Sequence, residues 1–326
     1  MIRLGTIGTS GICEHFLNGV ALTNKYILSA VYSRRYETGI AFGEKFGCKT
    51  VFTDLELMAK SDLIDAVYIA SPNSFHYSQS KIFLENKKHV ICEKPIATNA
   101  EEYIELKQLA DKNGLIYMEA IIPPYTHYYS KVKEAFSKIG KPVLARFDFS
   151  QRSSRMDAFL RGEHINIFDM SLHAGTLMDL GVYCVYAAID FLGVPKKISA
   201  NAQFLHNGAD GSGTAVFEYD GYSAILTYCK TAQGNIGSEI VGEKGVLKIS
   251  SVSQYAGVSL VINGKEEIIT EFPSRAEIMS GEASYFADFI TDFKGNAQKY
   301  KEMSEMCLNV HRCMDEIKNK AEIKYS

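Results

Sequence analysis

The feature that most constrains the fold is an alternation of short apolar runs with amphipathic segments over the first 120 residues. The runs have the length and apolar content of buried strands: IRLGTI (2–7), YILSAVY (26–32), LIDAVYIA (63–70), KHVICE (88–93) and LIYMEA (115–120). The segments between them have helical periodicity: 11–22, 37–47, 75–86 and 99–113. Strands that alternate with helices form parallel sheets covered on both faces. The pattern therefore predicts an α/β, doubly wound domain.

The pattern changes after IIPPYTHYY (121–129). The later chain has helical segments at 127–139 and 175–192, a strand at 141–151 and a helical tail at 281–320. Between 197 and 270 it has apolar runs joined by short turns, such as YDGY and NGK, which are typical of antiparallel meanders. We therefore predict a first domain at 1–121 and an α+β domain at 122–326 with a large, open, mainly antiparallel sheet. We expect the helices of 281–320 to pack back toward the first domain.

Composition excludes several classes of function. The formal net charge is −3, which argues against a nucleic-acid-binding protein. No apolar run approaches 18 residues, and the start of the chain lacks the pattern of a signal peptide, so we expect no membrane span. The seven cysteines are scattered without a CxxC pair, which predicts free thiols in the cytoplasm and no metal site.

A glycine-containing loop joins the first predicted strand to the first helix. It comprises Gly8, Thr9, Ser10, Gly11 and Ile12. A Rossmann dinucleotide-binding loop needs glycine for a tight turn and small residues where backbone amides approach the pyrophosphate, at the positive end of a helix. Here the spacing is G-x-S-x-x-C, with Ser10 and Cys13 in place of glycines. We interpret the loop as a pyrophosphate site; the alternative is an ordinary strand-to-helix turn.

The second predicted strand ends in Ser33-Arg34-Arg35. A cofactor with a free ribose 2′-hydroxyl usually meets Asp or Glu at this point. Arginine and a hydroxyl suit a 2′-phosphate instead. We therefore expect NADP(H) as the cofactor. The alternative is that the two arginines are solvated on the surface and that the cofactor is NAD(H).

The third and fourth predicted strand ends carry polar residues at the edge where doubly wound sheets bind ligands. Ser71-Pro72-Asn73 follows the third strand, and Asn73 either contacts a ribose or caps the next helix. His76 lies in the first turn of that helix, where it either contacts the cofactor or has a packing or surface role.

The fourth strand ends in Glu93-Lys94-Pro95. Pro95 disfavours helical geometry at Lys94, so the lysine is expected to point into the ligand-binding crevice and to polarise a hydroxyl or carbonyl oxygen. Thr98 and Glu101 fit a capping box for the following helix.

A second set of polar residues lies in DLGVY (179–183). On an α-helix Asp179 and Tyr183 share one face, and Gly181 between them suggests a close approach. Tyrosine can transfer a proton, and aspartate can orient it or bind sugar hydroxyls. The alternative is core packing with a local hydrogen bond.

Taken together, these segments resemble the Gfo/Idh/MocA oxidoreductase family (glucose–fructose oxidoreductase, inositol dehydrogenase) over essentially the whole length. The motifs that carry the resemblance are IRLGTIGTSGI, AVYSRR, SPNSFH, CEKPIAT, GTLMDLGVY and ASYFADFI. The tyrosine of DxGxY is typical of the dimeric dihydrodiol dehydrogenase and NADP-dependent xylose dehydrogenase branch. Ser10 and the pair His173-Ala174, where a glycine run often stands, depart from the family pattern.

The resemblance implies an N-terminal Rossmann domain, a C-terminal domain often used for oligomerisation, and hydride transfer between nicotinamide and the C–OH of a sugar, polyol or dihydrodiol. It implies Lys94, Asp179 and Tyr183 as the catalytic set. It also implies a group of cofactor contacts, which are Gly8 to Ile12, Ser33, Arg34, Asn73, Glu93 and Lys94. We add Pro72 and His76 to this group because of their position beside Asn73.

We expect a homodimer or homotetramer formed through the C-terminal sheet. Two alternatives of the same fold are a catalytically inactive NAD(P)-sensing regulator and a C=C or C=N reductase. The regulator is disfavoured because Lys94, Asp179 and Tyr183 are all present.

Overall fold

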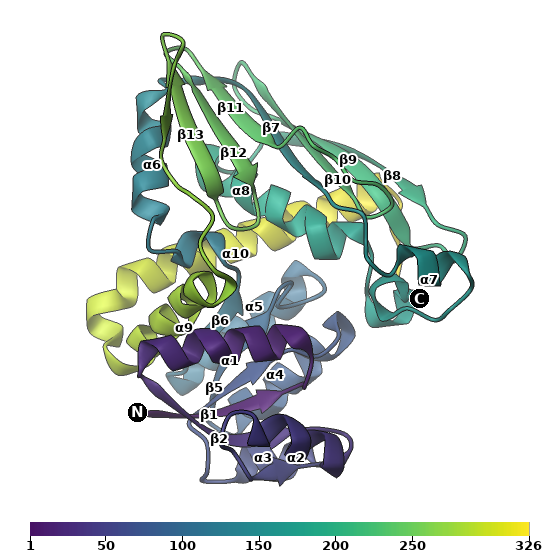
Figure 1. Cartoon of the computed structure of the whole chain (residues 1–326), viewed down its shortest axis with the longest axis vertical. Coiled ribbons are helices and arrows are strands. Elements are labelled where there is room, and N and C mark those ends of the chain that lie inside the picture. The colour runs from purple at the N-terminus through teal and green to yellow at the C-terminus, as the bar shows by residue number, and fades with distance from the viewer. Residues whose placement is uncertain (326) are drawn as a thin grey trace. The chain divides into compact units, whose positions relative to one another are not determined.

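The computed structural model describes residues 1–325, which form two compact units: Met1–Thr126 with Ser274–Glu305, and His127–Pro273 with residues 306–325. Figure 1 labels their helices and strands. The long helix α10 (Phe293–Lys320) contributes residues to both units.

The first unit is built on a parallel sheet with strand order β3-β2-β1-β4-β5-β6. Its strands are β1 (Ile2–Ile7), β2 (Tyr26–Tyr32), β3 (Val51–Phe52), β4 (Ala66–Ile69), β5 (His89–Glu93) and β6 (Tyr117–Ala120). Its helices are α1 (Gly11–Thr23), α2 (Tyr36–Glu44), α3 (Leu55–Lys60), α4 (His76–Glu85), α5 (Ala100–Asn113) and α9 (Arg275–Thr291). The predicted doubly wound α/β class is confirmed.

Two short elements of this unit are absent from the prediction. The strand β3 has only two residues and α3 only six, so neither carries a readable period. The strand nevertheless completes the sheet edge, and the Asp54 side chain caps α3 by accepting the Leu57 N–H at 3.0 Å.

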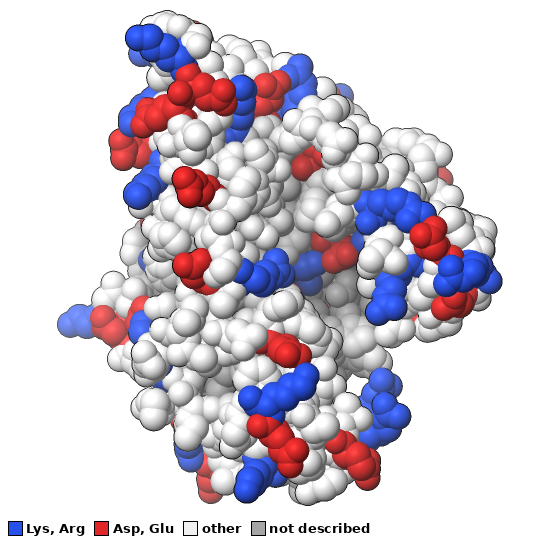
Figure 2. All heavy atoms as spheres, viewed as in Figure 1, with Lys and Arg blue, Asp and Glu red and all other residues white. Residues whose placement is uncertain are grey.

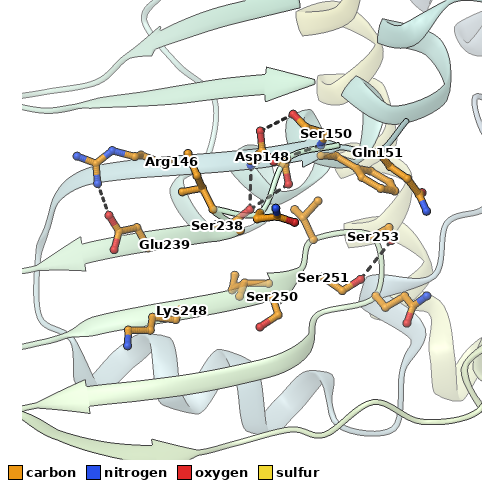
Figure 3. A pocket seen from close by; sticks show the side chains of 18 of the residues that line it. Arg146, Asp148, Ser150, Gln151, Ser238, Glu239, Lys248, Ser250, Ser251 and Ser253 are labelled. Carbon is orange, nitrogen blue, oxygen red and sulfur yellow. Dashed lines mark hydrogen bonds and ion pairs between the residues drawn. The ribbon is translucent and has the colours of Figure 1, made fainter. Parts of the chain in front are cut away.

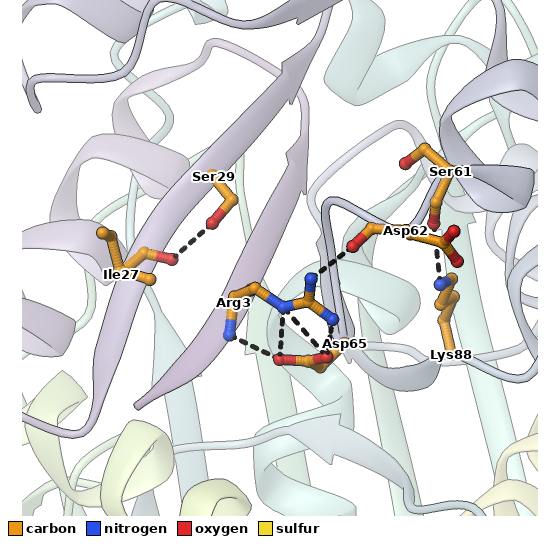
Figure 4. A network of polar contacts seen from close by, with 7 residues as sticks. All are labelled: Arg3, Ile27, Ser29, Ser61, Asp62, Asp65 and Lys88. Atoms are coloured by element: carbon orange, nitrogen blue, oxygen red, sulfur yellow. Dashed lines mark hydrogen bonds and ion pairs between the residues drawn. The ribbon is translucent and has the colours of Figure 1, made fainter.

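A polar network fixes the amino ends of β1 and β4 (Figure 4). Asp65 accepts hydrogen bonds from the Arg3 backbone at 2.9 Å and from Arg3 Nε at 3.1 and 3.2 Å. Arg3 also donates to the Asp62 carbonyl oxygen, and Lys88 donates to that of Ser61 at 2.8 Å. The bonds to Arg3 lower the pKa of Asp65. One ion pair and several hydrogen bonds tie this edge together, and ligands of doubly wound sheets bind at the opposite, carboxyl edge.

The second unit is built on an eight-stranded sheet with order β14-β13-β12-β11-β7-β10-β9-β8. Its strands are β7 (Pro142–Ser150), β8 (Lys197–Phe204), β9 (Asp210–Glu218), β10 (Ser223–Cys229), β11 (Ser238–Gly242), β12 (Val246–Ser251), β13 (Ala256–Ile262) and β14 (Lys265–Ile268). All neighbours pair antiparallel except β7 and β10, which are parallel. The prediction of a large, mainly antiparallel sheet is confirmed.

Two helices of this unit, α6 (Tyr129–Lys138) and α8 (Val182–Leu192), contact the sheet, and a π-helical turn, η5 (Leu177–Gly181), precedes α8. The short helix α7 (Met156–Leu160) packs against Phe168 in a small separate cluster. Helix α8 contacts β7 and β10, and burial alternates along β10, so one face of the strand packs on the helix and the other is half-exposed. The predicted helix at 175–192 is therefore only partly α-helical.

One helical stretch among the described residues is long and apolar enough, by length and composition alone, to be a candidate membrane span. Met170–Leu192 has a mean hydropathy of 1.3 over its most apolar window, but 83% of that window is buried inside the protein. This burial is typical of the core helix of a folded domain.

Candidate active site

The loop after β1 has the geometry of an anion-binding turn. Gly8 has φ +109°, and a Cβ there would lie 2.8 Å from the Ala70 carbonyl oxygen, so only glycine fits. Ser10 is the N-cap of α1, but its side chain makes no capping hydrogen bond, and it is exposed together with Gly11. Thr9 and Ile12 are half-buried beside them. The hydroxyl of Ser10 and the first amides of α1 are therefore accessible to a pyrophosphate.

The residues after β2 differ in exposure. Ser33 is buried, and its backbone N–H donates to the Phe52 carbonyl oxygen at 3.0 Å. Arg34 and Arg35 are exposed, and within residues 1–325 neither forms an ion pair. Two uncommitted guanidinium groups at this strand end suit a phosphate.

His76 joins the loops that follow β4 and β5. Its ring is buried, with Nδ1 2.8 Å from the Pro95 carbonyl oxygen and Nε2 2.8 Å from that of Ser71. Burial lowers the pKa of His76, although both carbonyl contacts favour its charged form. Since both ring nitrogens face the backbone, the side chain holds these two loops together. Pro72 and Asn73 lie between them, and Asn73 begins a 3₁₀ turn, η1 (Asn73–Phe75), ahead of α4.

The segment after β5, residues 93–98, is called the EKP turn below. Its Lys94–Pro95 peptide bond is cis, and Lys94 is half-buried. The Ile96 N–H donates to Glu119 Oε1 at 2.8 Å, and the Tyr117 hydroxyl donates to the Ile96 carbonyl oxygen at 3.4 Å. With the His76 contact, three side chains thus fix the backbone immediately after Lys94.

The capping box predicted for α5 is wrong in its residues. Asn99 is the N-cap, and its side chain accepts the Glu102 N–H at 2.9 Å. Thr98 instead donates both its N–H and its hydroxyl to Glu102 Oε2, each at 2.8 Å. The true start lies one residue later because Asn99 is also a strong N-cap, which the pattern Thr98–Glu101 concealed.

Glu93 is buried at the carboxyl end of β5. Its Oε1 accepts a hydrogen bond from the Tyr68 hydroxyl at 2.5 Å, and the Tyr68 ring stacks on Phe16. Burial raises the pKa of Glu93. Glu282 on α9 is also buried, and its pKa is raised by burial and then by the nearby charge of Glu93. The EKP turn thus begins at a carboxyl group embedded in the core.

Asp179 lies in the π-helical turn η5 and Tyr183 in the first turn of α8. The expectation that both lie on one regular α-helix is wrong, because the π-helical turn inserts an extra residue into the helical repeat. Gly181 does meet a close neighbour, as predicted: a Cβ there would lie 3.1 Å from the Tyr228 ring. Tyr183 is buried, and its ring packs edge-on against Phe149.

Sequence reasoning missed two charged residues beside Asp179. Lys230 Nζ lies 2.7 Å from Asp179 Oδ2. Asp210 Oδ2 accepts the Leu177 N–H at 2.6 Å, and burial raises the pKa of Asp210 to about 6. Both residues follow or begin strands of the second sheet, where neither belongs to a motif. Their only signal was a charge next to an apolar run.

The departure at His173-Ala174 has a local explanation. His173 has φ +51°, a conformation in which glycine is common, and its ring stacks on Tyr325 with centroids 5.0 Å apart. Exposed charges near α7 are paired locally: Arg152 with Asp157 and Arg161 with Glu163, both at 2.7 Å. Charges of both signs gather over this helix in Figure 2, in agreement with a solvated loop.

The proposed cofactor residues therefore follow four neighbouring strands of one sheet, β2, β1, β4 and β5. Asp179 and Tyr183 belong to the second unit. Strands that run parallel bring such loops to one edge, which is where a dinucleotide binds in a doubly wound sheet.

Comparisons with known proteins agree with this geometry. Residues 2–121 match the family described as "Oxidoreductase family, NAD-binding Rossmann fold", and residues 129–248 match the "GFO/IDH/MocA C-terminal domain". The chain is 37% identical to scyllo-inositol 2-dehydrogenase (NADP(+)) IolU of Bacillus subtilis, over 100% of this chain and 98% of that protein. It is 28% identical to trans-1,2-dihydrobenzene-1,2-diol dehydrogenase of Xenopus tropicalis, over 73% and 71%.

A solved structure has the same fold. KijD10, a 3-ketoreductase from Actinomadura kijaniata in complex with NADP and TDP-benzene, superposes with a TM-score of 0.81 at 22% identity, over 98% of each chain. The two family matches cover residues 2–121 and 129–248, and the similarity to IolU extends over 100% of the chain. The chain belongs to the Gfo/Idh/MocA family and is an NAD(P)-dependent oxidoreductase.

Proposed function

We propose that this protein is an NADP(H)-dependent dehydrogenase that oxidises a ring hydroxyl of a cyclic polyol or sugar. The observation that carries the proposal is the full-length similarity to an NADP-dependent scyllo-inositol 2-dehydrogenase, combined with an intact Lys94, Asp179 and Tyr183. The substrate in the name of trans-1,2-dihydrobenzene-1,2-diol dehydrogenase is likewise a ring that carries neighbouring hydroxyl groups.

Each catalytic residue has a distinct role in this proposal. Bound NADP(H) supplies the hydride acceptor or donor. Lys94 polarises the oxygen of the reacting C–OH, because a fixed ammonium stabilises negative charge that develops there. Tyr183 or Lys94 transfers the hydroxyl proton, and Asp179 accepts a hydrogen bond from a substrate hydroxyl. The contacts of Ile96 and Pro95 support this role by limiting how far Lys94 can move.

The cofactor residues divide into contacts and supports. We propose that Gly8, Thr9, Ser10, Gly11 and Ile12 surround the pyrophosphate, and that Ser33 and Arg34 bind the 2′-phosphate. Asn73 and Pro72 are proposed to line the ribose and nicotinamide side, where Lys94 reaches the reacting atoms. His76 and Glu93 are proposed to act mainly by holding the neighbouring loops, since their polar atoms are engaged with the protein.

The domains follow from the same proposal. We assign cofactor binding to 1–121 and substrate binding with self-association to 122–326, with the helices of 281–320 returning to the first domain. The family matches at 2–121 and 129–248 support this division.

We further propose that the chain forms a homodimer or homotetramer through the open face of the second sheet. A polar groove of about 740 Å³ lies there, lined by Arg146, Asp148, Ser150, Ser238, Lys248, Ser250 and others (Figure 3). Light scattering on the purified protein tests this: a monomer at micromolar concentration overturns the proposal, and Ser250→Arg should dissociate the oligomer by placing charge on the face.

The proposed location is the cytoplasm. All seven cysteines are free, and six of them are buried. Free thiols are the usual state in a reducing compartment.

The decisive experiment measures NADP+ and NAD+ reduction with a panel of inositols, pyranoses and dihydrodiols. We expect turnover of at least one ring polyol with NADP+, and a rise of about 10- to 100-fold in KM for NADP+ alone in Arg34→Ala, because a charge-assisted phosphate contact is lost. Arg152→Ala, whose guanidinium pairs with Asp157, is the matched control. NADPH binding without any turnover would favour the regulator, and turnover only of enones or imines would favour the reductase.

A further inference from the structure

Lys230, directly after β10, is a buried cation that contacts Asp179. Its side chain is 3% exposed, and its Nζ lies 2.7 Å from Asp179 Oδ2 and 3.3 Å from the Ile167 carbonyl oxygen. The same ammonium lies over the Phe168 ring, 5.5 Å from the centroid. A buried ammonium requires an anion and further acceptors, and this site provides both.

The turn η5, which carries Asp179, is anchored at its start by the same end of the β9–β10 hairpin. Asp210 Oδ2 accepts the Leu177 N–H at 2.6 Å, and the Asp210 carbonyl oxygen accepts the Thr176 hydroxyl at 2.7 Å. The Lys230 N–H donates to the Gly211 carbonyl oxygen at 3.0 Å, so Lys230 and Asp210 flank one hairpin end. One hairpin end therefore binds the beginning of η5 by Asp210 and its middle by Lys230.

Close packing leaves η5 little room to shift. A Cβ on Gly175 would lie 2.0 Å from Asp210 Oδ1, and one on Gly181 would lie 3.1 Å from the Tyr228 ring. A π-helical turn is intrinsically less stable than an α-helical one and often marks a functional position. Here its conformation is maintained by contacts from a neighbouring hairpin.

We propose that Lys230 is a positioning residue that fixes the Asp179 carboxylate, as an anion, in the orientation that receives a substrate hydroxyl. The inference rests on the proposed function, since it takes Asp179 as a substrate contact. The exposures separate the two roles: the Asp179 side chain is 41% exposed, whereas Lys230 is covered. Lys230 thus acts through Asp179 and does not meet the substrate.

Lys230→Met is the informative substitution. It keeps an unbranched chain of similar length over Phe168 and leaves a carboxylate that solvent can reach, so the fold should persist. We expect kcat/KM for the polyol to fall about 10- to 100-fold, while the NADPH dissociation constant stays within twofold of wild type. Lys230→Arg, which retains the charge, should recover part of the loss. A kcat/KM within twofold of wild type in Lys230→Met overturns the proposal.

Lys133→Met is the matched control for loss of a structural ion pair. Lys133 belongs to the same unit and pairs with the buried Asp190 at 2.9 Å, with side-chain exposures of 31% and 3%. It should lose thermal stability and keep wild-type kcat/KM. Equal losses of kcat/KM in both variants would mean that any broken pair in this unit impairs turnover, and would overturn the specific role of Lys230.

A double-mutant cycle tests whether Lys230 acts through Asp179. If it does, Lys230→Met adds no further loss of kcat/KM to Asp179→Asn, so the double variant matches the single one. Losses that multiply would overturn the proposal by showing independent roles.

A structural readout separates this inference from the proposed function. If wild-type protein oxidises no compound of the panel, the proposed function fails. Crystal structures of wild type and Lys230→Met then decide the positioning role alone. Displacement or disorder of the Asp179 carboxylate in the variant supports it, and an unchanged carboxylate overturns it.

Discussion

The EKP turn and the turn η5 carry proposed catalytic side chains, Lys94 and Asp179, and hold them in different ways. Around Lys94, side chains bind the backbone of the turn: His76 contacts the Pro95 carbonyl, and Glu119 accepts the Ile96 N–H. Around Asp179, a buried cation, Lys230, pairs with the carboxylate itself. The first arrangement fixes the backbone from which the Lys94 side chain extends. The second fixes the end of a short side chain.

The difference has an electrostatic consequence. Burial lowers the pKa of His76 in the first unit, so this support is neutral in the folded protein near pH 7. Burial raises the pKa of Asp210 in the second unit to about 6. The Asp210 carboxyl group is therefore ionised at neutral pH, and its burial in the ionised form lowers the stability of the fold. The two sites should therefore respond in opposite directions to pH.

The largest expected effect comes from removing Lys94. Lys94→Met should lower kcat by about 10²- to 10⁴-fold because polarisation and proton transfer are lost. NADPH affinity, measured by fluorescence, and the melting temperature should change little, since the backbone of the EKP turn is held by other residues. Lys81→Met, which removes an exposed lysine paired with Glu105, is the control. Unimpaired turnover in Lys94→Met would refute the proposed mechanism.

Asp210→Asn should show the strongest dependence of stability on pH. The folded pKa of Asp210 is about 6, above the ordinary 3.8. The contribution of Asp210 to the free energy of unfolding is therefore fully present below about pH 4 and is lost as pH rises through 6. The loss is on the order of 3 kcal/mol. Asparagine keeps an acceptor for the Leu177 N–H without a charge. The stability of the variant relative to wild type should therefore increase between pH 4 and 7. Parallel unfolding free energies in urea across this range would contradict the pKa shift.

Alanine substitutions at two glycines of the proposed pyrophosphate loop, Gly8 and Gly11, should have opposite effects on stability. Alanine at φ +109° with a Cβ 2.8 Å from the Ala70 carbonyl oxygen should cost about 2 kcal/mol or more, and should weaken NADPH binding. Gly11→Ala meets no atom within 4 Å and lies in a helix, so its unfolding free energy should rise by up to about 1 kcal/mol. Thermal melts of both variants measure the contrast, and equal melting temperatures would argue against the loop geometry.

The smallest effect is expected from His76→Gln. The folded pKa of His76 lies below its ordinary 6.5, so wild type should lose stability relative to the variant as pH falls below about 6.5. His89, whose pKa burial also lowers, is present in both proteins and cancels in the difference. Urea unfolding at pH 5.5 and 7.5 checks the sign. A wild type that gains stability in acid would show that the carbonyl contacts outweigh burial.

The first unit was largely readable from the sequence because its elements have strong local signals. The run YILSAVY is a strand over its full predicted range, Tyr26–Tyr32, and helix α5 begins within one residue of its predicted start. The errors lie where the signal is short or ambiguous. The strand β3 has two residues, and Thr98 and Asn99 compete as caps of one helix.

The second unit shows what local patterns leave out. Composition correctly marked 175–192 as helical, but the π-helical turn depends on Asp210 and Lys230, which lie more than 30 residues away. The parallel pairing of β7 with β10 within an otherwise antiparallel sheet is likewise a long-range choice. No periodicity within a window of ten residues carries either fact.

The sequence by itself therefore determined the class of fold, and it singled out residues 8–12, Lys94, Asp179 and Tyr183 as the proposed cofactor loop and catalytic set, because each of these signals depends on residue type at short spacing. Only the tertiary structure decided what holds them. His76 and Glu119 converge on the EKP turn, and Lys230 on Asp179, because buried polar groups must find partners wherever the fold brings them. Such partners are chosen by proximity in space, which spacing along the chain does not encode.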